Sequence, residues 1–474
     1  MASTALPSQY VSPTEIRTLF SNALSAMYRD EVPLYADLVA LISDANEATF
    51  ARRPQVKAKI LETNQLERLH LERHGAIRLG TAEEMFMMAR FLKLMGMVPV
   101  GYYDLAQAGL PVHATCFRTT DLDSLSQNPF RLFVSLLRLP LVAPNLRSKV
   151  AEILSRRQIF HNRVLDLVTL AEMNDGRLNQ SEAAELITLG LQTFKWQSSA
   201  VVSMAEYAEL HSESPLLADI VGFRGPHINH LTPRTLDIDA VQKLMQIHGF
   251  PVKDMIEGPP QRNCPILLRQ TSFKALEEGV HFPSDRGLVL GSHKARFGEV
   301  EERGAALTPK GRKLYDQLMQ DCTRRGITSL DEEAYAAVFA AFPDDWETLR
   351  KQELAWFRYY IAEEQDLAAL RQDSAGMIPN SVEECVEYGW IKYEPLVYED
   401  FLPLSAAGIF ASNLGGENAN RAKMGTQLGD EFAALEAALQ VTVKDEMYTY
   451  ARLQEESLAS CRRVLFVEVR SSDK

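Results

Sequence analysis

The stretch that decides the fold of this chain is GPHINHLTPRTLDID, residues 225–239. Thr232 precedes Pro233, and a residue before proline is pushed away from helical dihedral angles, so we expect this stretch to be extended. In an extended chain, successive side chains point to opposite faces, and His227 and His230 therefore point apart. A single functional site can use at most one of these two histidines.

A second stretch, HGAIRLGTAEE at residues 74–84, repeats the spacing around one of the two histidines. In each stretch an arginine follows a histidine after four residues, and a helix-start residue follows it after seven. The two sets are His74, Arg78 and Thr81, and His230, Arg234 and Asp237. Such a repeat indicates two copies of one structural unit. It marks His230 as the site residue and leaves His227 as a bystander.

The sequence around both stretches predicts the same order of elements: a strand, a helix and three strands. In the first copy, RHGAIRLG is typical of a strand, a helix runs from Thr81 to Gly96, and MVPVGYYDL, LPVHATCFRTT and PFRLFVSLLRL are typical of strands. In the second copy, LADIVGFRGPHINHLTPR is the expected first strand and DIDAVQKLMQIHGF the helix. The three further strands are KDMIEG, PILLRQTSFKAL and HKARFGEVEERG. We therefore expect an α+β fold in which two βαβββ units form a cupped mixed sheet around one metal site.

The segments outside these units show helical patterns. The expected regions are an N-terminal helical region (1–71), the first βαβββ unit (72–145), a helical insertion (146–215), the second βαβββ unit (216–307), and a C-terminal, mostly helical region (308–474) with a short extended segment near 394–410. The methionine-rich run MFMMARFLKLMGM in the first unit is expected to be core.

The composition favours an enzyme that acts on a small molecule. The chain has 474 residues, of which 46% are hydrophobic and 24% charged, and its formal net charge is −13. This acidic balance argues against nucleic acid or an anionic membrane surface as the main partner. The five cysteines are scattered without CxxC spacing, and no run of about eighteen apolar residues occurs. We expect a cytoplasmic protein, a monomer or a small homo-oligomer, without a disulfide framework.

A metal held by the two repeat histidines needs a third ligand. The last strand of the second unit, RFGEVEERG, offers Glu299 and Glu301 on one face and Glu302 on the other. The pattern alone leaves the choice between Glu299 and Glu301 open. Two neutral imidazoles and one carboxylate leave neighbouring coordination positions open, which suits non-haem Fe(II) and oxygen chemistry. Because the last strand of the first unit carries no acid, we expect one metal and not two.

Each of these residues also has a purely structural interpretation. A histidine in an extended stretch is often only hydrogen-bonded, and glutamates on an edge strand are often solvated. Arg78 could be a surface charge, but it shares a strand face with His74, about 13 Å further along at 3.3 Å per residue. The two side chains could therefore hold the two ends of one small acid. We expect structural roles for the other histidines: His70, His113, His161, His211, His248, His281 and His293.

Five long motifs resemble one known family, that of the 2-oxoadipate dioxygenases/decarboxylases (2-hydroxyglutarate synthases) of the vicinal oxygen chelate superfamily. The motifs are HGAIRLGTAEE, GPHINHLTPRTLDID, RQTSFKAL, ARFGEVEERGAALTPKGR and VYEDFLPLSAAGIF. The resemblance covers roughly residues 10–460. It implies an Fe(II)-dependent enzyme that converts 2-oxoadipate and O2 into 2-hydroxyglutarate and CO2 in lysine catabolism.

The same resemblance implies two groups of site residues. They are the Fe(II) ligands His74, His230 and Glu299, and the substrate-binding residues Arg78, Leu404 and Ser405, of which Arg78 and Ser405 would also be catalytic. Other functions stay open at this point. A non-redox isomerase or epimerase of the glyoxalase type usually has a fourth protein ligand, an extradiol dioxygenase has the same triad, and a binding protein could keep the cup without chemistry.

Overall fold

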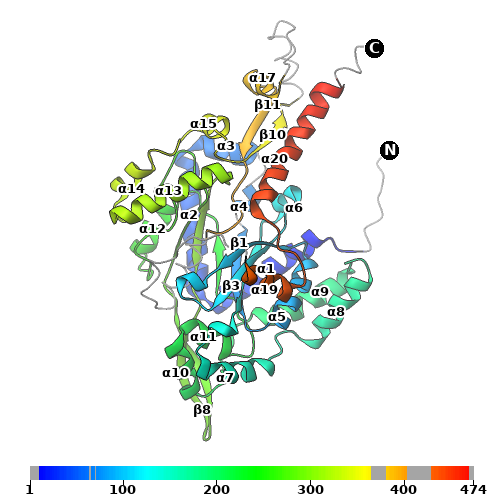
Figure 1. Cartoon of the computed structure of the whole chain (residues 1–474), viewed down its shortest axis with the longest axis vertical. Helices are drawn as coiled ribbons and strands as arrows, with labels where there is room; N and C mark the ends of the chain where they lie inside the picture. The colour runs from blue at the N-terminus through cyan, green and yellow to red at the C-terminus, as the bar shows by residue number, and fades with distance from the viewer. Residues whose placement is uncertain (1–9, 63–65, 70, 364–380, 403–428, 469–474) are drawn as a thin grey trace. The chain divides into compact units, whose positions relative to one another are not determined.

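The computed structural model describes residues 10–62, 66–69, 71–363, 381–402 and 429–468 (Figure 1). The chain folds into two compact units. The first comprises Met1–Glu257, Gln270–Glu302 and Asp400–Lys444, and the second comprises Gly258–Arg269, Arg303–Glu399 and Asp445–Lys474. The region boundaries expected from the sequence stay a prediction. No helix in the described ranges is long and apolar enough to cross a membrane.

A five-stranded mixed sheet organises the first unit, with the order β2-β3-β4-β1-β5. Its strands are β1 (Glu72–Leu79), β2 (Val98–Asp104), β3 (Val112–Arg118), β4 (Arg131–Leu137) and β5 (His230–Pro233). Strand β1 runs parallel to β4 and antiparallel to β5, and β3 runs antiparallel to both β2 and β4. The expected first strands of the two repeats are therefore neighbours. The α+β class and the mixed sheet expected from the sequence are confirmed.

Two helices of the first unit begin at the caps that the sequence predicts. The Thr81 hydroxyl accepts from the backbone N–H of Glu84, and the Asp237 carboxylate accepts from that of Ala240, so both repeat positions are N-caps. The α-helices are α1 (Pro13–Glu31), α2 (Pro33–Arg52), α3 (Pro54–Glu62), α4 (Leu66–Leu69), α5 (Ala82–Lys93), α6 (Leu122–Gln127), α7 (Pro144–Ser155), α8 (Asn162–Met173), α9 (Gln180–Gly190), α10 (Met204–Glu213), α11 (Pro215–Val221), α12 (Ile238–Ile247) and α19 (Asp430–Leu439). Short 3-10 turns are η1 (Ala106–Ala108), η2 (Leu139–Leu141) and η3 (Leu191–Phe194).

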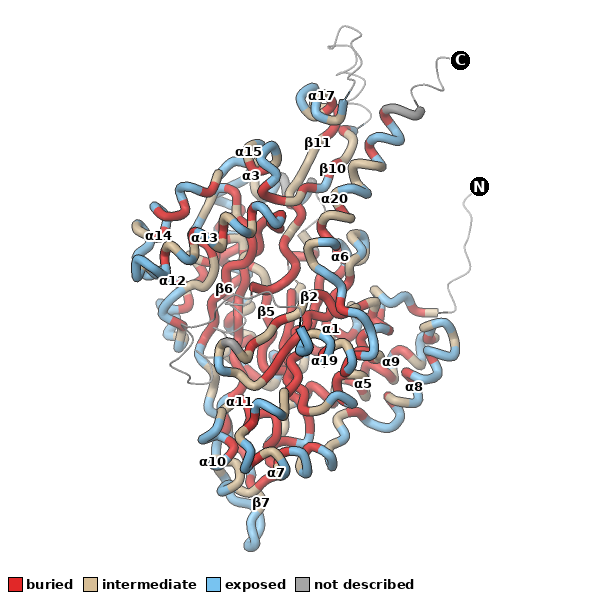
Figure 2. The backbone as a smooth tube through the Cα atoms, viewed as in Figure 1, coloured by how far each residue is buried: buried red, intermediate tan, exposed pale blue. Residues whose placement is uncertain are grey.

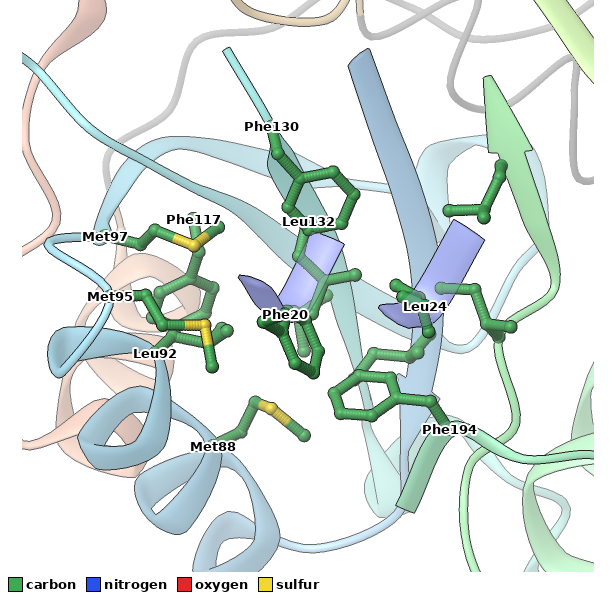
Figure 3. Packing of buried hydrophobic residues seen from close by; sticks show 14 of the residues in the cluster. Phe20, Leu24, Met88, Leu92, Met95, Met97, Phe117, Phe130, Leu132 and Phe194 are labelled. Carbon is green, nitrogen blue, oxygen red and sulfur yellow. The ribbon is translucent and has the colours of Figure 1, made fainter. Parts of the chain in front are cut away.

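The core of the first unit lies between this sheet and helices α1 and α5. Figure 3 shows Phe20 and Leu24 of α1 among side chains from α5, β3 and β4. The methionine-rich run contributes Met85, Met88 and Met95, all fully buried, which confirms its expected core position. Figure 2 shows that burial follows the strands of the sheet, whereas the outer helices carry exposed residues.

The second repeat differs from the expected order in three places. The segment LADIV is the buried helix α11 and not a strand, because Pro215 starts a helix at its first position and a short apolar run fits a buried helix as well as a strand. KDMIEG is not a strand and makes one isolated bridge, between Glu257 and Gln270. The hairpin of β7 (Glu277–Ser284) and β8 (Gly287–Lys294) was not expected, and it stands between β6 (Leu268–Ser272) and β9 (Glu299–Arg303), which pair with each other.

The second unit contains helices and one small sheet. Its elements are α13 (Pro309–Arg325), α14 (Glu332–Phe339), α15 (Trp346–Lys351), β10 (Phe357–Ile361), α17 (Val382–Glu387), β11 (Ile391–Pro395), α20 (Glu446–Arg462) and the π-helical turn η5 (Arg463–Glu468). The sequence predicts one helix over WETLRKQELAWFRYYIAEE, but α15 ends at Lys351. Glu353 adopts a left-handed φ of 54°, which breaks the helix, and the tyrosine-rich stretch behind it forms β10 and pairs with β11.

Candidate metal centre

Three side chains from different strands meet in the interior of the first unit. His74 lies in β1, His230 begins β5 and Glu299 begins β9. One donor atom from each lies within 4.8 Å of the other two, and all three residues are buried. The antiparallel pairing of β1 with β5 places Ala76 opposite His230, so both imidazoles lie on one face of the sheet with ring centroids 5.3 Å apart.

Neighbouring polar groups orient Glu299. Its Oε1 accepts from Thr232 Oγ1 at 3.1 Å and from Gln270 Nε2 at 2.7 Å, and it lies 2.9 Å from His74 Nε2. Within the described residues, the other carboxylate oxygen, Oε2, and Nδ1 of His230 are buried without a hydrogen-bond partner. Buried polar atoms are normally satisfied, so these two atoms are candidate donors to a metal ion. Two imidazoles and a carboxylate fit a divalent transition metal.

The charge states of the donors suit a cation. Burial lowers the pKa of His230 to about 3, so this imidazole is neutral and keeps a lone pair for a metal. Burial opposes ionisation of Glu299, but the contact with His74 and the positive charge of Lys253 help to hold the pKa of Glu299 below its usual value. The group therefore combines neutral nitrogen and anionic oxygen donors.

Glu301 contacts the opposite side of the His74 ring. Its Oε2 lies 2.9 Å from Nδ1 of His74, and its Oε1 lies 3.4 Å from Nε of Arg73. Glu299 and Glu301, which share one face of β9, therefore address the two different nitrogens of a single imidazole. A carboxylate behind a histidine ligand fixes its ring orientation and raises its basicity. Of the two glutamates between which the pattern could not choose, Glu299 is the one that also reaches His230.

Aromatic rings cover the site. Phe401 lies edge-on to His74 with centroids 4.7 Å apart, and Phe297 stacks on His230 at 4.6 Å. The segment that carries Phe401 is fixed by a buried pair, in which Arg118 donates to both oxygens of Asp400 at 2.6 and 2.7 Å. Residues 404 and 405, which the family resemblance links to the substrate, lie outside the described residues.

Arg78 follows His74 on the same strand and is buried, with 3% of its surface exposed. Its Nη1 donates to Asp219 Oδ2 at 2.5 Å. Asp219, His227 and His293 form a second buried group, in which one donor atom from each residue lies within 4.8 Å of the other two. The sequence left His227 as a bystander and gave His293 a structural role, and the fold brings both to Asp219 because α11 and β8 lie against the loop before β5.

Sequence reasoning missed several residues of the site. Thr232 had a signal, since it stands two residues after His230 on an extended chain and so shares its face. Glu301 was named from the sequence as an alternative ligand, but not as the carboxylate that contacts Nδ1 of His74. Gln270 and Asp219 had none. They reach the site only through the pairing of β6 with β9 and the packing of α11.

Comparisons with known proteins place the chain in a family. A family model described as 2-oxoadipate dioxygenase/decarboxylase matches residues 20–413. A protein of that name from Pseudomonas putida is 50% identical over 465 residues, covering 96% of this chain and 98% of its own length, and one from Escherichia coli is 47% identical over 452 residues, covering 95% and 98%. The crystal structure of the hydroxyglutarate synthase in complex with 2-oxoadipate from Pseudomonas putida superposes with a TM-score of 0.86 at 47% identity, covering 96% of this chain and 99% of that one. The chain therefore belongs to the 2-oxoadipate dioxygenase/decarboxylase family.

Proposed function

We propose that this protein converts 2-oxoadipate and O2 into 2-hydroxyglutarate and CO2 with Fe(II) bound by His74, His230 and Glu299. The observation that carries the proposal is the buried donor triad, in which Oε2 of Glu299 and Nδ1 of His230 have no hydrogen-bond partner within the described residues. Support also comes from the family and from the relative's complex with 2-oxoadipate. A ferrous ion at this triad would supply the electrons and open coordination positions that O2 and a 2-oxo acid need.

The chain's own residues hold and shield this centre. Thr232 and Gln270 fix one oxygen of Glu299, and Glu301 holds the ring of His74 in place. The rings of Phe297 and Phe401 keep water away from the two imidazoles. Exclusion of water strengthens the electrostatic contacts in the site and protects reactive species from side reactions.

Arg78 is the residue that we assign to the distal carboxylate of the substrate. It extends from the same strand as His74, and its positive charge is felt at His230, whose pKa it helps to lower. A buried guanidinium selects a dicarboxylate over a monocarboxylate, because a distal carboxylate beside it gains charge-assisted hydrogen bonds that a methyl group cannot make. By family resemblance, Leu404 and Ser405 would complete this end of the pocket.

The arrangement favours this reaction over a non-redox isomerase. Such an enzyme usually needs a fourth protein ligand, which the strand beside His74 would have to supply. Strand β4 pairs with β1 in parallel, its partner to His74 is Arg131, and it contains no acidic residue. All five cysteines are buried and free, which supports our assignment to the reducing cytoplasm.

The test is a count of reactants and products. Fe(II)-loaded protein given 2-oxoadipate should consume O2 and release CO2 and 2-hydroxyglutarate in equal amounts. His230→Ala should abolish all three, whereas His248→Ala, at an exposed position, should leave them unchanged. Bound metal and a folded protein without O2 uptake would refute the dioxygenase and favour the isomerase. Uptake with catechols but not with 2-oxoadipate would indicate an extradiol enzyme.

A further inference from the structure

A second buried cluster, made of Asp219, His227, His293 and Arg78, lies next to the proposed substrate end of the site. Asp219 Oδ1 is 2.8 Å from Nε2 of His293 and 3.3 Å from Nε2 of His227, while Oδ2 accepts from Nη1 of Arg78 at 2.5 Å. The four residues come from α11, the loop before β5, β8 and β1, and each is at most 5% exposed. Asp219 is the one member that contacts all the others.

Asp219 is ionised in this cluster. Burial by itself would raise its pKa, but the attraction of Arg78 and the hydrogen bond with His293 oppose burial, and the pKa of Asp219 lies well below its usual range. Burial also lowers the pKa of His227 to about 3, so this imidazole is neutral. The carboxylate and the guanidinium therefore form the charged pair of the cluster.

Tyr207 fixes the position of His293 from the other side. The Tyr207 hydroxyl lies 2.6 Å from Nδ1 of His293, whose Nε2 lies 2.8 Å from Asp219. A ring that donates its Nε2–H to the carboxylate accepts the tyrosine hydroxyl at Nδ1, so all three groups are satisfied in one arrangement. Trp196 supports both histidines, stacking on His293 with centroids 6.0 Å apart and meeting His227 edge-on at 4.7 Å. The line Tyr207–His293–Asp219 thus ends on Arg78.

The three donor residues resemble a metal-binding group, but their surroundings oppose a cation. The single carboxylate is already paired with the Arg78 guanidinium. Arg296 is a second buried guanidinium, close enough to lower the pKa of His227. Arg296 is itself paired with Glu31 and Glu278, so a divalent ion here would have to share the single Asp219 carboxylate with the Arg78 guanidinium, and burying that extra positive charge is costly. The cluster is therefore better suited to holding Arg78 than to holding a metal.

We propose that Asp219, oriented by His293 and Tyr207, is a positioning residue for Arg78 and so sets the preference for a dicarboxylate substrate. A guanidinium has five N–H donors in a planar fork, and fixing one edge determines where the others point. Asn229 assists, since its amide oxygen, turned towards Arg78, accepts from the same Nη1 at 2.8 Å. The inference rests on the proposed function, because it presumes that Arg78 binds the distal carboxylate of 2-oxoadipate.

Kinetics with two substrates separate positioning from general damage. We would compare Asp219→Asn and Tyr207→Phe with wild type on 2-oxoadipate and on 2-oxohexanoate, which has the same chain length without the distal carboxylate. In Asp219→Asn the KM for 2-oxoadipate should rise on the order of 10- to 100-fold while metal content stays the same, because a displaced binding group costs this much. Constants for 2-oxohexanoate should change little. Tyr207→Phe, which removes only the hydroxyl at the far end, should shift KM in the same direction but less.

Tyr448→Phe, at a 70% exposed tyrosine, is the matched control and should leave both substrates unaffected. Equal losses on both substrates, or an unchanged KM in both variants, would overturn the inference. So would a second metal equivalent in wild type that is lost in Asp219→Asn.

Anaerobic calorimetry of 2-oxoadipate binding keeps this test separate from that of the reaction. Wild type that binds 2-oxoadipate without turning it over would refute the proposed function, and weaker binding by Asp219→Asn would still support the positioning role. Wild type that neither binds nor converts 2-oxoadipate would overturn both proposals.

Discussion

Exchanging each of the two glutamates on β9 for glutamine tests the proposed metal centre most directly. Glu299 and Glu301 lie on one face of the strand, both are fully buried, and each lies 2.9 Å from a different nitrogen of His74. Glutamine keeps the volume and one oxygen but removes the charge. If Glu299 is the ligand and Glu301 only orients His74, the two substitutions should differ in the size of their effect on metal affinity.

The expected magnitudes follow from these contacts. Glu299→Gln removes the anionic donor, so metal added at the protein concentration should not bind. Glu301→Gln leaves all three donors in place but weakens the contact that orients the His74 ring. Loss of such a contact typically lowers metal affinity about 10- to 100-fold, or by roughly 1.4–2.7 kcal/mol. Because Arg73 also loses a buried carboxylate at 3.4 Å, the free energy of unfolding should fall by about 3 kcal/mol.

The assay is anaerobic titration of metal-free protein with Fe(II) against a chromophoric chelator, with thermal unfolding run on the same samples. Glu302→Gln is the control, since Glu302 lies on the opposite face of β9, where it accepts from the backbone N–H of Ile238 at 3.4 Å, and its metal Kd should not change. Abolished binding in Glu301→Gln with retained binding in Glu299→Gln would invert the assignment. Wild-type affinity in both variants would place the metal elsewhere.

Three further substitutions test other parts of the argument. Arg78→Ala should lower kcat/KM for 2-oxoadipate, with a loss of transition-state stabilisation of about 2–5 kcal/mol and unchanged metal content. Loss of metal would contradict the assignment of Arg78 to the substrate. Gly75→Ala should lower the melting temperature through about 1–3 kcal/mol of overpacking, because the new Cβ would lie 2.7 Å from Cδ1 of Ile228; unchanged melting would show that β1 and β5 can move apart. Burial lowers the pKa of His113 from 6.5 to about 4, so the unfolded chain binds this proton first and stability falls as pH drops through that window, by roughly 3 kcal/mol. His113→Gln should therefore melt with a weaker dependence on pH between 6.5 and 4, and parallel curves for variant and wild type would refute this.

Local rules anticipated the elements whose signals lie close together in the chain. Thr81 and Asp237 cap helices because a side-chain oxygen followed by a free N–H three residues later is a contact within one turn. Rules of the same kind failed where tertiary packing decides between two states. The segment LADIV is apolar enough for a strand or for a buried helix. Glu353 ends a helical pattern with a left-handed φ, which cannot be predicted from a glutamate side chain. The β7–β8 hairpin had a usable signal in Asp285-Arg286-Gly287 between two alternating runs.

The sequence by itself determined the chemistry available to this protein: two histidines in equivalent places of a repeat, an acidic strand after the second copy, and an arginine on the strand of the first histidine. Each of these features can be recognised from the spacing of residues within one short segment, because side chains along a strand alternate between its two faces. Only the tertiary structure decided which carboxylate meets which atom. Glu299 and Glu301 differ by two residues, and their separate contacts with the nitrogens of His74 depend on how β9 is placed beside β1 and β5. Asp219 contacts Arg78 across 141 residues of chain, a separation over which no local pattern carries information, because the contact exists only once the fold brings α11 to β1.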